Sequence, residues 1–292
     1  MNNKKAQNNL VLGGGGVTGI AWMTGILTGL QEKGLDISKF DSIVGTSAGS
    51  TVGAQISSST SLTELFERQA NAAKQTHELV PKLNKLTLLW RLLPALRYWK
   101  KPVKFRQCIA KIAIKTNSVL PAKRLEVINA RLTDKVWPSE DSTPTLNIIA
   151  INALTGKHVV FNQHTDISLT NAVAASCAVP LVWPAVKVGD DTYIDGGIRS
   201  MNNADLITGC KNVLIISPTG LGKKGMPWAN LQDEVKFLQA EGAQVHVITP
   251  DEYSLSEMGK NPLDPSKRTD SALAGKKQGL AIYQEVVDSL EL

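Results

Sequence analysis

The pentapeptide Gly45-Thr46-Ser47-Ala48-Gly49 joins a short apolar run, Ser42-Ile43-Val44, to a stretch that favours a helix. A strand, a sharp turn and a helix in this order expose the hydroxyl of the central serine. The two glycines suit so tight a turn, because a Cβ at either position would clash. The following helix offers free backbone N–H groups and the positive end of its dipole where an oxyanion would form. The pattern therefore predicts that Ser47 is a nucleophile for hydrolysis or acyl transfer.

Outward from this turn, short apolar runs alternate with helical stretches along most of the chain. We expect strands over residues 9–12, 41–45, 146–153, 158–161, 186–188, 192–194, 213–217 and 245–249. We expect helices over residues 17–33, 48–57, 60–77, 169–178 and 231–241, and from the loop at 261–265 to about residue 290. This alternation predicts one α/β domain over residues 8–290, with a mainly parallel sheet flanked by helices.

A glycine-rich segment, Gly13-Gly14-Gly15-Gly16-Val17-Thr18-Gly19, lies between the first expected strand and the first expected helix. Consecutive glycines turn several N–H groups toward a bound group, which suits a phosphate or a tetrahedral oxyanion. The spacing also matches the dinucleotide fingerprint, with Asp36 lying 20 residues beyond Gly16. Asp36 does not end an apolar strand, and no Gly-Lys-Ser/Thr sequence is present, which excludes a P-loop. A nucleotide-binding module that uses residues 13–19 remains one alternative.

A second carboxylate-bearing motif, Asp195-Gly196-Gly197, follows an expected hairpin and places an acid at a strand end. Together with the segments at 14–19 and 45–49, in this order, it resembles the patatin-like phospholipase family. Ala175-Ser176-Cys177-Ala178-Val179-Pro180 and Gly25-Ile26-Leu27-Thr28-Gly29-Leu30 resemble further stretches of that family. The resemblance covers residues 9–217.

The resemblance implies a serine acyl hydrolase that releases fatty acid from phospholipid or lysophospholipid esters. Ser47 would be the nucleophile and Asp195 the base of a Ser–Asp dyad. The oxyanion hole would consist of Gly14, Gly15 and Gly16, and the supporting turns would contain Gly45, Gly49, Gly196 and Gly197. The chain departs from the family at Thr18, where members often carry Arg or Lys. No cofactor is expected.

A histidine supplies another hypothesis for the base. Ser47, Asp195 and His246 follow the chain order of an α/β-hydrolase triad, as in a non-patatin carboxylesterase or thioesterase. Residues 244–248 alternate like a strand, however, whereas the histidine of such a triad usually lies on a loop. The four histidines and three cysteines show no metal-ligand spacing, so we expect no metal.

The net charge of +6 is concentrated in one segment. Residues 79–125 contain 12 of the 32 Lys and Arg and none of the 26 Asp and Glu, so the remainder carries 20 − 26 = −6. Apolar and aromatic residues accompany these cations, which suits an anionic membrane surface. We expect a basic helical cap over 79–125 that binds such a surface, or a cap that packs on the core with a solvated basic face.

The remaining composition limits the location and the partners. We expect a cytoplasmic protein with peripheral membrane association, because the sequence shows no signal-peptide core and no run of about 20 apolar residues. We expect no nucleic-acid partner, because no nucleic-acid-binding motif accompanies the charge. The oligomeric state stays open.

Overall fold

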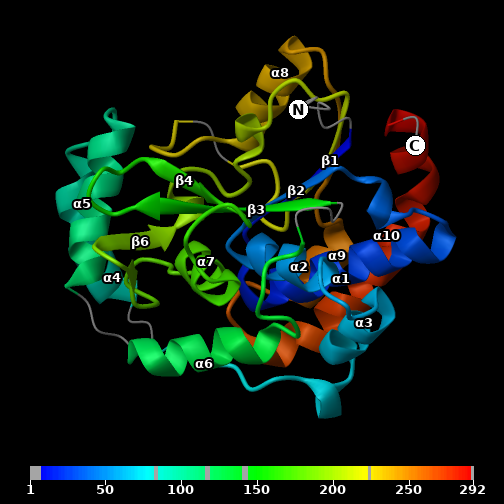
Figure 1. Cartoon of the computed structure of the whole chain (residues 1–292), viewed down its shortest axis with the longest axis horizontal. Coiled ribbons are helices and arrows are strands. Elements are labelled where there is room, and N and C mark those ends of the chain that lie inside the picture. The colour runs from blue at the N-terminus through cyan, green and yellow to red at the C-terminus, as the bar shows by residue number, and fades with distance from the viewer. Residues whose placement is uncertain (1–7, 82–84, 116–118, 140–143, 223–224, 291–292) are drawn as a thin grey trace.

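A computed structural model describes residues 8–81, 85–115, 119–139, 144–222 and 225–290 of the chain. The centre of this described part is one sheet of eight strands in the order β5-β6-β3-β2-β1-β7-β8, with β4 paired to β3 beside this path (Figure 1). The strands are β1 (Asn8–Leu12), β2 (Ser42–Thr46), β3 (Thr145–Asn152), β4 (His158–Phe161), β5 (Val186–Val188), β6 (Asp191–Asp195), β7 (Asn212–Ile216) and β8 (Gln244–Ile248). From β3 through β2, β1 and β7 to β8 the neighbours run parallel, whereas β4, β5 and β6 pair antiparallel. The predicted mainly parallel sheet is confirmed.

Helices cover both faces of this sheet. They are α1 (Gly16–Lys33), α2 (Ala48–Ile56), α3 (Leu62–Ala70), α4 (Lys85–Leu96), α5 (Pro102–Ile114), α6 (Pro121–Arg131), α7 (Leu169–Ser176), α8 (Leu231–Ala240), α9 (Glu252–Met258) and α10 (Arg268–Leu290). Leu10 and Leu12 of β1 belong to the apolar cluster that includes α1, α2, α7 and α10, whereas Val11 belongs to the cluster that includes α8. Figure 1 accordingly shows α8 above the sheet and α1, α2 and α7 below it. None of the described helices is long and apolar enough to cross a membrane.

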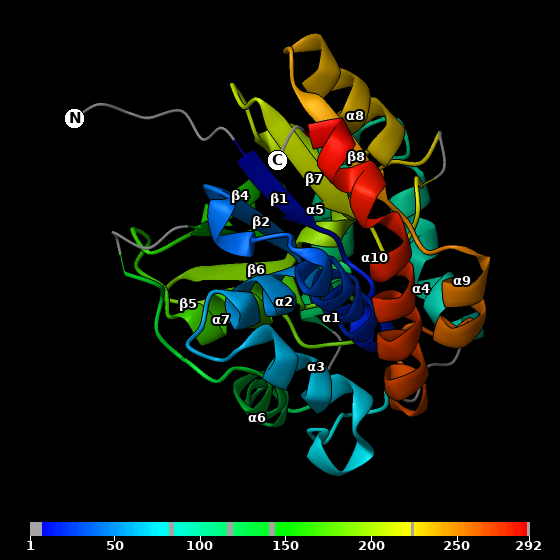
Figure 2. The same ribbon diagram turned by 90° about the vertical axis from the view of Figure 1, so that its right-hand side faces the viewer.

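The two long helices α1 and α10 lie side by side, as both ribbon views show (Figure 2). Their contact is close because glycines face the opposite backbone. A Cβ on Gly25 would lie 2.2 Å from the Ala272 carbonyl oxygen, and one on Gly279 would lie 2.4 Å from the Ile26 carbonyl oxygen. This packing holds α1, and therefore the glycine-rich loop that precedes it, in a defined place on the sheet.

Two helical expectations differ from the structure. The helix expected over 60–77 ends at Ala70, because the Asn71 side chain accepts a hydrogen bond from the Ala73 N–H and starts a separate 3₁₀ turn. The short helix α9 was not expected, and it begins where Asp251 accepts a hydrogen bond from the Ser254 N–H. Both differences arise from side chains that bond to the local backbone rather than from apolar periodicity.

The segment 79–125 contains α4, α5 and the start of α6, and its residues 82–84 and 116–118 lie outside the described part. Pro102 and Pro121 occupy the first helical position of α5 and α6, where a missing N–H costs nothing. The inner face of α5 packs through Ile109 in a cluster with Ile198, just after the Asp-Gly-Gly motif. The cap is therefore anchored to the sheet end that carries Asp195.

Candidate active site

Ser47 connects β2 to α2 in a strained backbone conformation, with φ 52° and ψ −115°. A serine adopts such a conformation only where the surroundings impose it. Here α2 lies so close to the sheet that a Cβ on Gly49 would be 1.8 Å from the Leu12 carbonyl oxygen, and one on Gly45 would be 2.7 Å from that of Gly49. The expected strand–turn–helix around Ser47 is therefore present, and the two glycines permit its close packing.

The backbone of Ser47 is held by neighbours that the sequence analysis did not assign. Its N–H donates to the Ser176 hydroxyl at 2.8 Å, and that hydroxyl donates to the Ile149 carbonyl oxygen at 2.7 Å. The Ser47 carbonyl accepts from the Ser50 hydroxyl at 2.7 Å and from the Cys177 thiol at 3.2 Å. These bonds leave the Ser47 side chain as the part of the residue that is available for chemistry.

Asp195 ends β6, and only β3 separates that strand from β2. Its Oδ1 accepts a hydrogen bond of 2.7 Å from the Gly197 N–H, which requires the chain to turn at Gly196. A Cβ on Gly196 would lie 2.5 Å from the Ile149 carbonyl oxygen, so the turn needs a glycine there. Asp195 is 3% exposed, and its Oδ2 has no hydrogen-bond partner within the described ranges. One buried carboxylate oxygen is thus left without a hydrogen bond.

Burial changes the proton affinity of this carboxylate. It raises the pKa of Asp195 from 3.8 to about 7, although the Gly197 N–H and the Ser47 hydroxyl each lower it. The Ser47 hydroxyl is close enough to influence the carboxylate, while no hydrogen bond of full strength joins the two side chains. Such loose contacts are common in the free form of enzymes and tighten around the substrate. Burial therefore makes Asp195 a stronger base than an ordinary aspartate, whose pKa is ~4.

Ser47 and Asp195 line the same cavity, which has a volume of about 240 Å³. Most of its wall is apolar, and two arginines complete it. Besides Ser47 and Asp195, the side chains that line it include those of Val17, Ile20, Arg124, Arg131, Cys177, Trp183, Ile198, Met201 and Leu263. A serine hydroxyl and a carboxylate in an apolar cavity suit the hydrolysis of an ester that carries a hydrocarbon chain.

The backbone donors for an oxyanion differ from the expected set. Gly15 and Gly16 line the cavity at the start of α1, and no hydrogen bond to either N–H is found in the described part of the chain. The Gly14 N–H instead donates to the Met201 carbonyl oxygen at 2.8 Å, so Gly14 is removed from the candidate donors. Ala48 also lines the cavity, and as the first residue of α2 its N–H lacks an intrahelical acceptor. The candidate oxyanion hole is therefore made by Gly15, Gly16 and Ala48.

The structure does not bring His246 to Ser47. His246 of β8 pairs with Leu214 of β7, and Leu214 pairs with Leu10 of β1. Leu10 in turn pairs with Ile43 of β2. Three strand spacings of about 4.8 Å, together about 14 Å, therefore separate His246 from β2. Its Nδ1 and the Ser289 hydroxyl are 2.8 Å apart. The triad hypothesis therefore lacks its histidine.

The nucleotide hypothesis also loses its acidic residue. Asp36 precedes β2, whereas the glycine-rich loop follows the end of the parallel strand β1, so the two lie at opposite ends of these strands. The Asp36 carboxylate accepts hydrogen bonds from the Ser38 N–H and hydroxyl at 2.9 and 2.7 Å. In the described ranges, no group of three or more His, Cys, Asp or Glu side chains is placed to hold a metal ion.

Arg124 is a cavity residue whose role the sequence did not indicate. It is 6% exposed, and its guanidinium lies 4.1 Å from the centre of the Trp183 ring. In the sequence it is one cation of a basic run, and its burial depends on a partner 59 residues away (183 − 124). The contact with Trp183 is visible only in three dimensions.

One known protein family matches most of the chain, and its description agrees with the ester hydrolysis that the cavity suits. Residues 10–207 match a family model described as patatin-like phospholipase. Similar solved structures include VipD from Legionella pneumophila, with 11% identity and a TM-score of 0.48, covering 97% of this chain and 67% of that one. They also include human GIVD cytosolic phospholipase A2, with 10% identity and a TM-score of 0.47, covering 98% of this chain and 63% of that one.

A further similar structure is the type III effector ExoU of Pseudomonas aeruginosa, with 15% identity and a TM-score of 0.43, covering 96% of this chain and 53% of that one. This chain thus spans between about half and two thirds of the length of these proteins. Among curated proteins, none matches the sequence.

Proposed function

We propose that this chain, which belongs to the patatin-like phospholipase family, is a serine acyl hydrolase that releases fatty acid from phospholipid or lysophospholipid esters. Family membership gives the class of enzyme, a lipid acyl hydrolase. The choice of substrate and the roles of the residues are our proposal. The observation that carries it is the meeting of Ser47, on its strained turn, with Asp195, whose pKa is raised to about 7, in one apolar cavity.

In the first half of the proposed reaction, the Asp195 carboxylate accepts the proton of the Ser47 hydroxyl while Oγ attacks the ester carbonyl carbon. The oxyanion that forms accepts hydrogen bonds from the free N–H groups of Gly15, Gly16 and Ala48. When the tetrahedral intermediate collapses, the C–O bond to the glycerol oxygen breaks, and Asp195 returns the proton to that oxygen. The products of this half are an acylated Ser47 and a deacylated lipid alcohol.

In the second half, Asp195 accepts a proton from a water molecule as the water oxygen attacks the acyl carbon. The same N–H groups stabilise the second oxyanion, and the bond to Ser47 Oγ breaks as Oγ regains a proton from Asp195. The fatty acid leaves. A base that serves both halves works best with a pKa near the working pH, and burial gives Asp195 such a pKa.

A fluorophosphonate probe tests the nucleophile. We expect one covalent adduct on Ser47 by peptide mass mapping, and we expect Ser47→Ala to remove both the adduct and ester hydrolysis. Ser266→Ala, at an exposed serine on a separate turn, serves as the matched control and should keep both. An adduct that persists in Ser47→Ala, with hydrolysis intact, contradicts the proposal.

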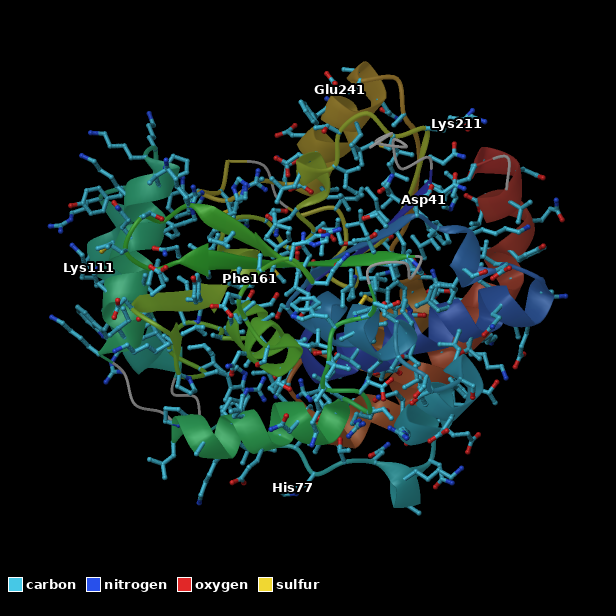
Figure 3. All side chains as sticks on the ribbon, viewed as in Figure 1. Asp41, His77, Lys111, Phe161, Lys211 and Glu241 are labelled. Carbon is cyan, nitrogen blue, oxygen red and sulfur yellow. The ribbon has the colours of Figure 1, made fainter. Side chains whose placement is uncertain are left out.

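We further propose that the cap associates with an anionic membrane surface. Around α4 and α5, nitrogen-tipped side chains extend away from the sheet, Lys111 among them (Figure 3). The exposed cations of this surface include Lys100, Lys101, Lys104, Lys111 and Lys115, and its exposed apolar residues include Trp90, Leu93, Leu96, Val103 and Ile114. Uncompensated cations beside exposed apolar side chains favour peripheral binding to anionic lipid.

Two residues of the basic segment have other contacts. The Arg106 Nε donates to the Gly156 carbonyl oxygen at 2.6 Å, and the Trp99 indole N–H donates to the Gly225 carbonyl oxygen at 2.8 Å. Trp90 is 71% exposed and is therefore the better fluorescence reporter of insertion. We expect a blue shift of its emission on binding to anionic vesicles and none with neutral vesicles.

A further inference from the structure

Arg124 projects from α6 into the wall of the cavity that holds Ser47 and Asp195. It is 6% exposed, and its Nη1 atom is buried without a hydrogen-bond partner in the described part of the chain. The guanidinium stacks on the Trp183 ring, with 4.1 Å between the central carbon and the ring centre. The arginine is thus held in one orientation by an aromatic surface and retains an unused donor.

Among the residues that the structure describes, no carboxylate forms an ion pair with Arg124. Burial lowers its pKa to about 10, so the guanidinium stays charged at neutral pH. The neighbouring Arg131 has its own partner, because Glu78 accepts hydrogen bonds from its Nε at 3.0 Å and its Nη2 at 2.6 Å. Asp195 favours the charged form of Arg124 electrostatically, but no ion pair joins the two within the described residues.

An isolated buried cation is costly unless an anion meets it. A planar guanidinium matches the oxygens of a phosphate, and stacking on an aromatic ring preorganises it for that contact. In a glycerophospholipid the phosphate is separated from the scissile ester by only a few covalent bonds of the glycerol. One cavity can therefore hold both groups, with the ester at Ser47 and the phosphate at Arg124.

We propose that Arg124, oriented by Trp183, binds the phosphate of the phospholipid or lysophospholipid substrate and so selects phosphate-bearing lipids over neutral glycerides. This specificity role rests on the proposed function, because it assigns the ester of the same lipid to Ser47. Arg131 does not serve as the phosphate ligand, since Glu78 already neutralises it.

The kinetic test compares two soluble substrates with the same short acyl chains, a diacyl phosphocholine and a diacylglycerol. We expect Arg124→Gln to lower kcat/KM for the phosphocholine about 10- to 100-fold, the effect of losing a charged hydrogen bond, and to change the diacylglycerol value less than about threefold. Arg124→Lys keeps the charge and loses the planar fork. Its kcat/KM for the phosphocholine should lie between the values of the wild type and of Arg124→Gln. Lys123→Gln removes the same charge from an exposed neighbour on α6 and should change neither value.

A binding test does not depend on turnover. Ser47→Ala protein should bind a non-hydrolysable diether phosphocholine more tightly than the matching diether glycerol, and adding Arg124→Gln should remove this preference. Inorganic phosphate alone should bind weakly to either form, because it lacks chains for the apolar wall. Inactive wild-type protein that keeps the binding preference would defeat the proposed hydrolysis while supporting the phosphate site.

Several results would overturn the assignment of Arg124. Equal loss of kcat/KM on both substrates in Arg124→Gln would show that the arginine acts through Asp195 or through the fold. An unchanged preference in the binding test would remove the phosphate contact. Inorganic phosphate bound as tightly as the diether lipid would make this a site for free phosphate.

Discussion

The proposed chemistry depends on the carboxyl group of Asp195. The burial of this group predicts the pH dependence of the reaction. The carboxylate accepts a proton only when it is ionised, and burial raises its pKa to about 7. We expect kcat/KM for a soluble ester to rise about tenfold for each pH unit below ~7 and to level off above it. A profile that is already flat from pH 5 upward contradicts this role.

The same carboxylate destabilises the fold at alkaline pH. Its pKa is raised from 3.8 to about 7 on folding, so between these values unfolding releases a proton and stability falls as the pH rises. Asparagine does not ionise and keeps an oxygen for the Gly197 N–H. We expect the gain in unfolding free energy from Asp195→Asn to be about 2–3 kcal/mol larger at pH 8 than at pH 5. Urea unfolding at both pH values measures it, and an equal effect at both would rule out a raised pKa.

At the scale of residues, short motifs identified Ser47, Asp195 and the glycine-rich loop because turn geometry is a local property. The occupied N–H of Gly14 could not be predicted, since its acceptor, the Met201 carbonyl, lies 187 residues further along the chain (201 − 14). The burial of Arg124 is equally non-local. Sequence therefore indicated the candidate site residues better than it indicated their surroundings.

At the scale of elements, the contact between α1 and α10 supports the glycine-rich loop. A Cβ on Gly279 would lie 2.4 Å from the Ile26 carbonyl oxygen, a backbone atom that cannot move without shifting α1. We expect Gly279→Ala to lower the unfolding free energy by about 1–3 kcal/mol. Leu273→Ala, on the exposed side of α10, is the matched control with a smaller expected effect. Equal unfolding midpoints for Gly279→Ala and the wild type would contradict the close packing.

The strands and most helices were predictable because their apolar residues repeat with the period of each element. The end of α3 and the existence of α9 were not, because single capping bonds at Asn71 and Asp251 decide them. Periodicity indicates the middle of an element, whereas side-chain bonds to the backbone determine its ends.

At the scale of the whole molecule, charge is separated between the cap and the remainder. Residues 79–125 carry +12 and the rest carries −6. We expect replacement of the exposed Lys100, Lys101 and Lys104 by Gln to reduce sedimentation with anionic vesicles by an amount that shrinks as salt increases, because the Debye length is about 8 Å at physiological ionic strength. Turnover of a short soluble ester should be unchanged.

The matched control for this test removes the same charge elsewhere, by replacing Lys33, Lys236 and Lys260, which are exposed and lie outside the cap. It should bind vesicles as the wild type does. Equal losses in the two triple variants would mean that net charge alone governs binding. Equal binding to neutral and anionic vesicles would leave the cap as a packed element with a solvated basic face.

The alternation of strands and helices along the sequence predicted the layered fold, but not the order of the strands. In the sheet, β1 lies between β2 and β7, although 165 residues separate the end of β2 at Thr46 from the start of β7 at Asn212 (211 − 46). That adjacency depends on packing between distant segments.

The release of fatty acid from a phospholipid and lysophospholipid extract, measured by mass spectrometry with a chelator present, tests the Ser47–Asp195 dyad most directly. The wild type and His246→Ala should release fatty acid at similar rates, and folded Ser47→Ala and Asp195→Asn should release almost none. Retained release in Asp195→Asn together with its loss in His246→Ala would contradict the dyad.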